Sequence, residues 1–254
     1  MTAEPATAQP ALEVRGVSKL YGGLRAVADV SFTVAPGEVL GIAGPNGAGK
    51  TTLFDTITGH TIASEGEMFL GGTPIRGTKI HHRCRLGLAR TFQHPVAAET
   101  LTALENTYLA ASFRRGREGR SRSGDVEAGR AALQLVGLEH HATTVASLLP
   151  VYDQKRLMLA TALATNPAVL LLDEPFGGLN PNEIDETIAL LQRLRGGGLA
   201  IVCIEHVMRA LVALADRVLV MHHGAELFLG TPEAMMRDRQ VVEVYLGASG
   251  EGAA

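Results

Sequence analysis

Val39-Leu40-Gly41-Ile42-Ala43-Gly44-Pro45-Asn46-Gly47-Ala48-Gly49-Lys50-Thr51-Thr52 is the stretch of this 254-residue chain that decides its fold. Its first five residues are apolar without alternation, which predicts a strand buried on both faces. Residues 44–51 fit the pattern G-x-x-x-x-G-K-[ST]. A helical run over residues 50–58 ends at Gly59, as expected because glycine commonly follows the last helical residue. Strand, glycine-rich loop and helix in this order predict a phosphate-binding P-loop.

Each part of this loop has a task in binding a nucleotide. Glycines let backbone N–H groups surround phosphate oxygens, and the N-terminus of the helix adds the positive end of its dipole. The Lys50 ammonium then reaches the β- and γ-phosphates, and the Thr51 hydroxyl ligates Mg²⁺. The predicted nucleotide-binding residues of the loop are Gly44, Pro45, Asn46, Gly47, Ala48, Gly49, Lys50, Thr51 and Thr52.

A second stretch supplies two adjacent carboxylates. Residues 169–172 form an apolar strand pattern that ends in Asp173 and Glu174. An aspartate in this position holds Mg²⁺, and a glutamate polarises the water that attacks the terminal phosphate. An apolar strand that ends in two carboxylates is weak evidence by itself, but together with the upstream P-loop it predicts nucleotide hydrolysis.

The remaining chain alternates strands and helices, which predicts an α/β fold with a largely parallel sheet. Residues 95–147 are more helical and more polar, and they form an expected insertion into this frame. The expected strands are 12–17, 30–34, 66–72, 199–204 and a closing hairpin of 218–221 with 226–229. The expected helices include 155–164 and 181–195.

Composition excludes several classes of protein. Hydrophobic residues make up 46% and charged residues 19%, which argues against wholesale disorder and fibrous folds. A net charge of -3 argues against a general nucleic-acid-coating protein, so no nucleic-acid partner is expected. Cys84 and Cys203 are too few for a disulfide framework, and no signal peptide or membrane-length apolar stretch is visible. The arginine-rich segment 114–122 is either a solvated loop or a contact for anionic lipid or an acidic partner surface.

With these motifs in place, residues 12–246 resemble the nucleotide-binding subunits of ABC transporters. The resemblance implies a P-loop NTPase cassette with a mostly parallel core sheet, an antiparallel β subdomain and a helical subdomain inserted at about 95–165. Residues 1–11, rich in Ala, Pro and Thr, are expected to be a disordered leader, followed by the ATPase domain at 12–247 and a disordered tail at 248–254. The resemblance also implies ATP as the nucleotide and Mg²⁺ as the cofactor.

The resemblance assigns roles to further residues. Tyr21 occupies the position of the aromatic that stacks on adenine. Gln93 matches the glutamine that reaches Mg²⁺ and the attacking water, and that signals to the membrane subunit. His206 matches the histidine that contacts the γ-phosphate, so Glu174, His206 and Gln93 are the expected catalytic residues. Thr51, Gln93 and Asp173 are the expected metal ligands, and Asn180 stands where most relatives carry aspartate.

One motif departs from the family. The dimer-spanning signature Leu-Ser-Gly-Gly-Gln is replaced by Leu149, Pro150, Val151, Tyr152 and Asp153. Pro150 has neither the serine hydroxyl nor an N–H, and the next two residues have side chains where backbone must approach phosphate closely. A homodimer would therefore have two impaired sites, so we expect a heterodimer with a paralogous ATPase subunit.

The C-terminal pattern and the segment around Gln93 resemble subunits of branched-chain amino-acid importers and their urea or amide relatives. This implies transmembrane permeases as partners, a solute-binding protein as an indirect partner, and a peripheral position on the cytoplasmic face of the membrane. Two alternatives stay open: a regulatory or weakly hydrolysing cassette, suggested by the divergent signature, and a non-transport ABC ATPase. The intact Lys50, Asp173, Glu174 and His206 argue against the first. A single cassette without heptads argues against the second.

Overall fold

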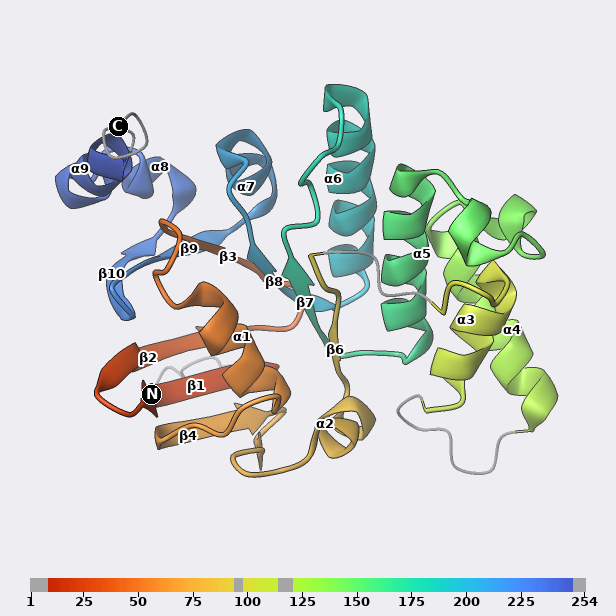
Figure 1. Ribbon diagram of the computed structural model, residues 1–254, viewed down its shortest axis with the longest axis horizontal. Coiled ribbons are helices and arrows are strands. Elements are labelled where there is room, and N and C mark those ends of the chain that lie inside the picture. The colour runs from red at the N-terminus through yellow and green to blue at the C-terminus, as the bar shows by residue number, and fades with distance from the viewer. Residues whose placement is uncertain (1–8, 94–97, 114–120, 249–254) are drawn as a thin grey trace, which may run out of the picture.

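The larger of two sheets positions the glycine-rich loop. The computed structural model describes residues 9–93, 98–113 and 121–248, without the side chains of 246–248. The strand order is β10-β9-β3-β8-β7-β6 (Figure 1). Neighbours are parallel except for β9 and β10, which form the expected closing hairpin. The strands are β3 (Val39–Ala43), β6 (Leu88–Arg90), β7 (Val169–Asp173), β8 (Ala200–Ile204), β9 (Arg217–His222) and β10 (Ala225–Gly230).

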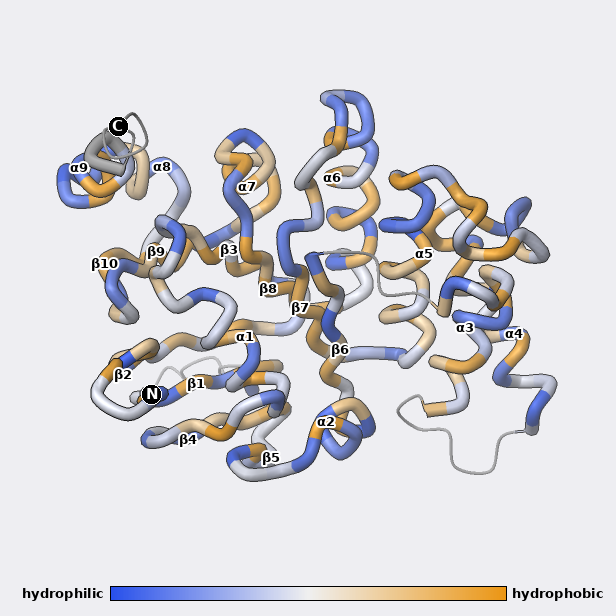
Figure 2. Tube along the Cα trace, in the orientation of Figure 1, coloured by the Kyte–Doolittle hydropathy of each residue, from blue (hydrophilic) through white to orange (hydrophobic). Residues whose placement is uncertain are grey.

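Successive residues of the central strands face two different hydrophobic cores. In β7, Val169 and Leu171 pack in the core that contains the apolar side of α1 (Lys50–Thr58). Leu170 and Leu172 point the other way, into the core shared with α6 (Pro181–Gly196) and α7 (Met208–Leu214). Side chains alternate along a strand, so a strand covered on both faces must be apolar throughout, and Figure 2 shows these strands in orange. The predicted strand at 39–43 and helix at 50–58 are both confirmed.

The smaller sheet has the order β2-β1-β4-β5 and is antiparallel throughout. Its strands are β1 (Leu12–Tyr21), β2 (Leu24–Val34), β4 (Glu65–Leu70) and β5 (Thr73–Pro74). It covers α1 from the side away from the larger sheet (Figure 1). The fold class expected from the sequence, a parallel core sheet with a separate antiparallel one, is confirmed.

Helices fill the segment where an insertion is expected. α3 (Ala103–Ala111), α4 (Arg122–Leu135) and α5 (Val151–Ala164) pack together beside the larger sheet (Figure 1). Short 3₁₀ turns at Glu139–His141 and Ala146–Leu148 connect α4 to α5. α3 begins where the Thr102 hydroxyl and the Glu105 carboxylate cap each other's backbone N–H groups. Residues 114–120 of the arginine-rich segment lie outside the described residues.

The start of α5 corrects one prediction. The sequence pattern begins this helix at residue 155, whereas the structure begins it at Val151. Pro150 is the N-cap residue, with φ of -54°. A proline there loses no helical hydrogen bond, because the first N–H groups of a helix have no internal partner. The divergent signature residues 151–153 are therefore the first turn of a helix.

Several elements have no counterpart in the prediction. They are α2 (Ile80–Leu86), β5, β6, α7, α8 (Pro232–Met235) and α9 (Arg239–Ala248). Within the expected leader, Ala11 is buried and its N–H bonds to the carbonyl of Val34. The domain boundaries stay predictions, since residues 1–8 and 249–254 lie outside the described part. Among the described residues, no helix has both the length and the hydropathy needed to cross a bilayer.

Candidate nucleotide site

The glycine-rich loop joins the end of β3 to the start of α1, and two of its glycines cannot be replaced. Gly44 has φ of 141° and Gly49 has φ of 95°, both outside the range that residues with side chains prefer. A Cβ at either position would lie 2.2 Å from a backbone oxygen, that of Met221 or that of Ala26. The loop therefore packs directly against the backbone of β9 and β2, which fixes its shape before any ligand binds.

Lys50 is held inside this loop. Its Nζ donates to the carbonyl oxygens of Gly44 at 2.7 Å and Pro45 at 2.9 Å, and the residue is only 6% exposed. Burial lowers the pKa of Lys50, while the nearby carboxylates of Glu174 and Asp173 act in the opposite direction. The ammonium is thus partly desolvated, with only neutral carbonyls bonded to it, a setting in which an arriving phosphate gains a strong contact.

A cavity of about 420 Å³ brings most of the loop residues together with Glu174 and His206, whereas Asp173 and Gln93 are not among the residues that line it. Its walls come from β2, from the loop, from the ends of β7 and β8, and from the turn between β9 and β10. The residues that line it include Asn46, Gly47, Ala48, Gly49, Lys50, Thr51, Thr52, Glu174 and His206, with Leu24, Arg25, Ala26, His223 and Gly224 at the edge. Two stretches far apart in sequence, the P-loop and the carboxylate after β7, therefore face one space.

Tyr21 stands apart from this cavity. It ends β1, it is half exposed, and it pairs with Leu24, which does line the cavity. Its hydroxyl lies 3.5 Å from the Thr61 hydroxyl, and the Lys19 ammonium lies 4.8 Å from the centre of its ring. The expected adenine-stacking residue is thus near the rim of the cavity rather than among its walls.

Glu174 is clamped by the two other expected catalytic residues. Gln93 Nε2 donates to Glu174 Oε2 at 2.6 Å, and His206 Nε2 lies 2.9 Å from Glu174 Oε1. Glu174 has φ of 49°, a left-handed conformation that a residue with a side chain rarely adopts. The backbone turns sharply at this point, directly after the buried strand β7.

Two charged residues with buried side chains beside the site were not among the residues predicted from the sequence. The first is Arg90, whose Nη2 donates to Asp173 Oδ2 at 2.7 Å. The second is Glu205, which accepts the N–H of His206 at 2.7 Å and that of Phe176 at 3.1 Å. Burial raises the pKa of Glu205, and these N–H groups oppose that shift. Glu205 directly follows the apolar strand β8, which was the available signal, whereas Arg90 ends the three-residue strand β6, which gives no sequence pattern.

The divergent signature residues lie at the start of α5. Leu149 is buried, Val151 is 66% exposed, and the Tyr152 hydroxyl bonds to Glu186 Oε2 of α6 at 3.0 Å. Burial raises the pKa of Tyr152. Asp153 lies 3.5 Å from Arg156 and 3.9 Å from His141. Tyr152 is therefore folded against a neighbouring helix, and Asp153 is paired within its own chain.

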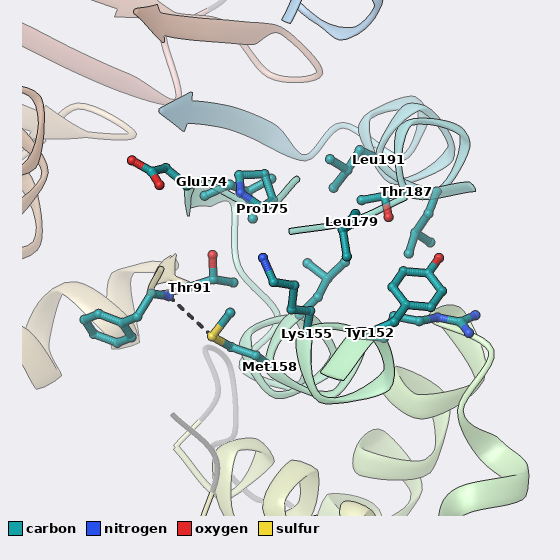
Figure 3. A pocket seen from close by; sticks show the side chains of 14 residues that line it. Thr91, Tyr152, Lys155, Met158, Glu174, Pro175, Leu179, Thr187 and Leu191 are labelled. Carbon is teal, nitrogen blue, oxygen red and sulfur yellow. Dashed lines mark hydrogen bonds between the residues drawn. The ribbon is translucent and has the colours of Figure 1, made fainter. Parts of the chain in front are cut away.

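The loop after Glu174 is bonded to α5 as well. Lys155 Nζ donates to the carbonyl of Gly177 at 2.6 Å, and burial lowers the pKa of Lys155. Asn180 caps α6 by accepting the N–H groups of Asn182 and Glu183. A narrow cavity of about 30 Å³ separates these elements, and Figure 3 shows Tyr152, Lys155 and Met158 facing Glu174, Leu179 and Leu191 across it.

Comparisons with known proteins agree with this geometry. Residues 27–177 match the ABC transporter family. The chain is 36% identical to the high-affinity branched-chain amino acid transport ATP-binding protein LivG of Escherichia coli strain K12, over 94% of this chain and 98% of that protein. It is also 36% identical, with the same coverage, to the corresponding protein BraF of Pseudomonas aeruginosa. Among solved structures, the ADP conformation of MJ1267, an ATP-binding cassette of an ABC transporter, has a TM-score of 0.83 at 28% identity, over 94% of this chain and 99% of that one. The chain therefore belongs to the ABC transporter family, as one of its ATPase cassettes.

Proposed function

We propose that this chain powers the uptake of branched-chain amino acids, or of a related small polar solute such as urea or an amide, by hydrolysing ATP in the cavity beside Lys50 and Glu174. The observation that carries the proposal is the clamped carboxylate of Glu174 at the wall of that cavity. The solute is supported by the names of LivG and BraF, both branched-chain amino acid transport proteins.

In this proposal Glu174 is the general base. Its two oxygens are oriented by Gln93 and His206, so one lone pair can accept a proton from a water in the cavity. His206 is also placed to contact the γ-phosphate, because it lines the same cavity as Lys50. Tyr21, at the rim beside Leu24, supplies an aromatic face for adenine.

The oxygen atoms near the loop suit Mg²⁺. The Thr51 hydroxyl, the Asp173 carboxylate and the Gln93 amide are hard oxygen donors, which this ion prefers, and one or two carboxylates together with substrate phosphates are its usual protein site. Bound there, the ion would neutralise charge on the β- and γ-phosphates. Lys50 adds a fixed positive charge within the loop.

The experiment is Glu174→Gln, which keeps the shape of the side chain and removes the base. We expect the assembled transporter to keep its affinity for ATP, to lose roughly a hundredfold to ten-thousandfold in hydrolysis, and to lose uptake of labelled leucine. Glu127→Gln, the same substitution at an exposed glutamate of α4, is the control and should leave turnover nearly unchanged. Near-normal hydrolysis by Glu174→Gln would assign the base to another residue.

We further propose that a groove of about 300 Å³ receives a permease segment. Its lining is mostly apolar and comes from α2, β6, Phe92 and α5, with Ile80 and Met158 among its residues. The chain continues from β6 through Phe92 to Gln93, whose amide bonds to Glu174. A permease segment bound in the groove would therefore act on Gln93 and, through it, on Glu174. This arrangement would keep the protein at the cytoplasmic face of the membrane, with a solute-binding protein acting on the far side.

The divergent signature supports a heterodimer with a paralogous ATPase subunit. In a closed pair, each nucleotide lies between one subunit's P-loop and the other's signature. Pro150 and Val151 offer no hydroxyl, and Asp153 carries a negative charge in the first turn of α5, where phosphate would approach. The partner would bring an intact signature to this chain's Lys50 and Glu174, so this chain would house the more active site.

A further inference from the structure

We propose that Arg90 is the residue that positions Asp173 for Mg²⁺, by tying it to the helix that follows the P-loop. This inference rests on the proposed ATPase site and adds a residue that the motifs did not include. Arg90 Nη2 donates to Asp173 Oδ2, and Nη1 donates to Asp55 Oδ1 of α1 at 2.5 Å. One guanidinium thus joins β6, β7 and α1.

The arm of the bridge that reaches Asp173 is buried, whereas Asp55 on the other arm is 36% exposed. The side chain of Arg90 is 6% exposed and that of Asp173 is 9% exposed, so water screens their attraction little. The rings of Phe54 and Phe92 lie 5.5 and 5.0 Å from the guanidinium carbon and hold its plane. Arg90 Nε is buried and has no hydrogen-bond partner among the described residues, so the two terminal nitrogens provide all of its bonds.

This geometry matters for the metal because a carboxylate has several acceptor positions. Arg90 engages Oδ2 of Asp173, and Oδ1 stays available for Mg²⁺ or one of its waters. Partners behind a metal ligand fix its orientation, and their loss typically lowers metal affinity about 10–100-fold. Asp55 lies four residues after Thr51 on α1, so the second arm of Arg90 sets two of the three expected metal ligands, Thr51 and Asp173, at a fixed separation.

A lysine at position 90 cannot bind Asp173 and Asp55 at once. Its single ammonium carries one compact charge, whereas the planar fork of arginine reaches two carboxylates at once.

A change at residue 90 should affect ATP binding only when the metal is present, because the P-loop and Lys50 make no hydrogen bond to Arg90 in the structure.

The test is calorimetry of ATP binding to the full chain, with Mg²⁺ or with EDTA. For Arg90→Gln we expect about a 10–100-fold loss of affinity in Mg²⁺ and unchanged affinity in EDTA. Arg90→Lys should fold and give an intermediate loss in Mg²⁺. Arg15→Gln, the same substitution at an exposed ion pair with Glu13, should behave as wild type.

The outcomes separate the inference from the function on which it rests. Equal losses with and without Mg²⁺ would mean general damage to the fold and would overturn the positioning role. If Arg90→Lys bound ATP with wild-type affinity both in Mg²⁺ and in EDTA, the two-armed bridge would be overturned. If Arg90→Gln does not fold, the result for Arg90→Lys alone tests the inference. A wild-type chain that bound ATP in neither condition would instead contradict the proposed function.

Discussion

Lys50 is a buried ammonium whose bonds all go to neutral carbonyls, so phosphate binding should depend strongly on its charge. We expect Lys50→Ala to weaken Mg-ATP binding by about 1.5–3 kcal/mol, the range for hydrogen bonds to charged groups. Lys79→Ala, at an exposed lysine, is the control. The measurement is calorimetry across neutral and alkaline pH, and unchanged affinity at neutral pH would remove the P-loop assignment.

The pH dependence of that experiment has a definite sign. Burial lowers the pKa of Lys50, so the free protein loses this proton at a lower pH than an exposed lysine does. Bound phosphates favour the charged form, and affinity should therefore fall as pH rises towards the ordinary lysine range. In Lys50→Ala this fall should be absent.

The residues that sequence could predict are those in short linear motifs. Lys50 and Glu174 follow from patterns of a few residues whose chemistry is local. Arg90 and Glu205 could not be paired from sequence, since their partners lie 83 and 29 residues away. Only the fold, by setting the ends of β6, β7 and β8 side by side, gives those charges their roles.

At the scale of elements, uninterrupted apolar strands and a helix bounded by glycine were predictable, whereas the three-residue strand β6 and the ten-residue helix α9 were not. The strand at 39–43 and the helix at 50–58 match their prediction, because burial and a terminal glycine define both. β6 has only three residues, too few for a pattern, and it exists because it pairs with β7. α5 began earlier than expected because a proline at the N-cap permits a helix to start there.

The groove between α2 and α5 yields a prediction about docking. In a Cys84→Ser background, which removes the half-buried thiol of the groove, Ala98→Cys or Ile80→Cys should cross-link to a permease cysteine in the assembled complex. Ala97, the neighbouring position, lies outside the described residues. Val242→Cys on α9, far from the groove in Figure 1, is the control. Cross-linking from the control alone would exclude this docking surface.

At the scale of the whole molecule, two large hydrophobic cores meet at the central strands of the larger sheet, and a third, smaller core packs against β9. One of the two large cores lies under α1 and the smaller sheet, and the other joins the sheet to α5 and α6. The P-loop belongs to the first core and the divergent signature to the second. In the proposed heterodimer, this cassette would present Lys50 and Glu174 to one nucleotide and the altered signature at Pro150 to the other. The two nucleotide sites would therefore be unequal.

The most direct measurement is the ATPase rate of the assembled transporter when the catalytic glutamate is changed to glutamine in each cassette separately. We expect Glu174→Gln in this chain to remove most of the activity and the corresponding change in the partner cassette to remove much less. The difference arises because loss of preorganised donors to the phosphate typically costs about 10²–10³ in rate. A milder effect of Glu174→Gln than of the partner's change, or brisk hydrolysis by this chain alone as a homodimer, would contradict the account.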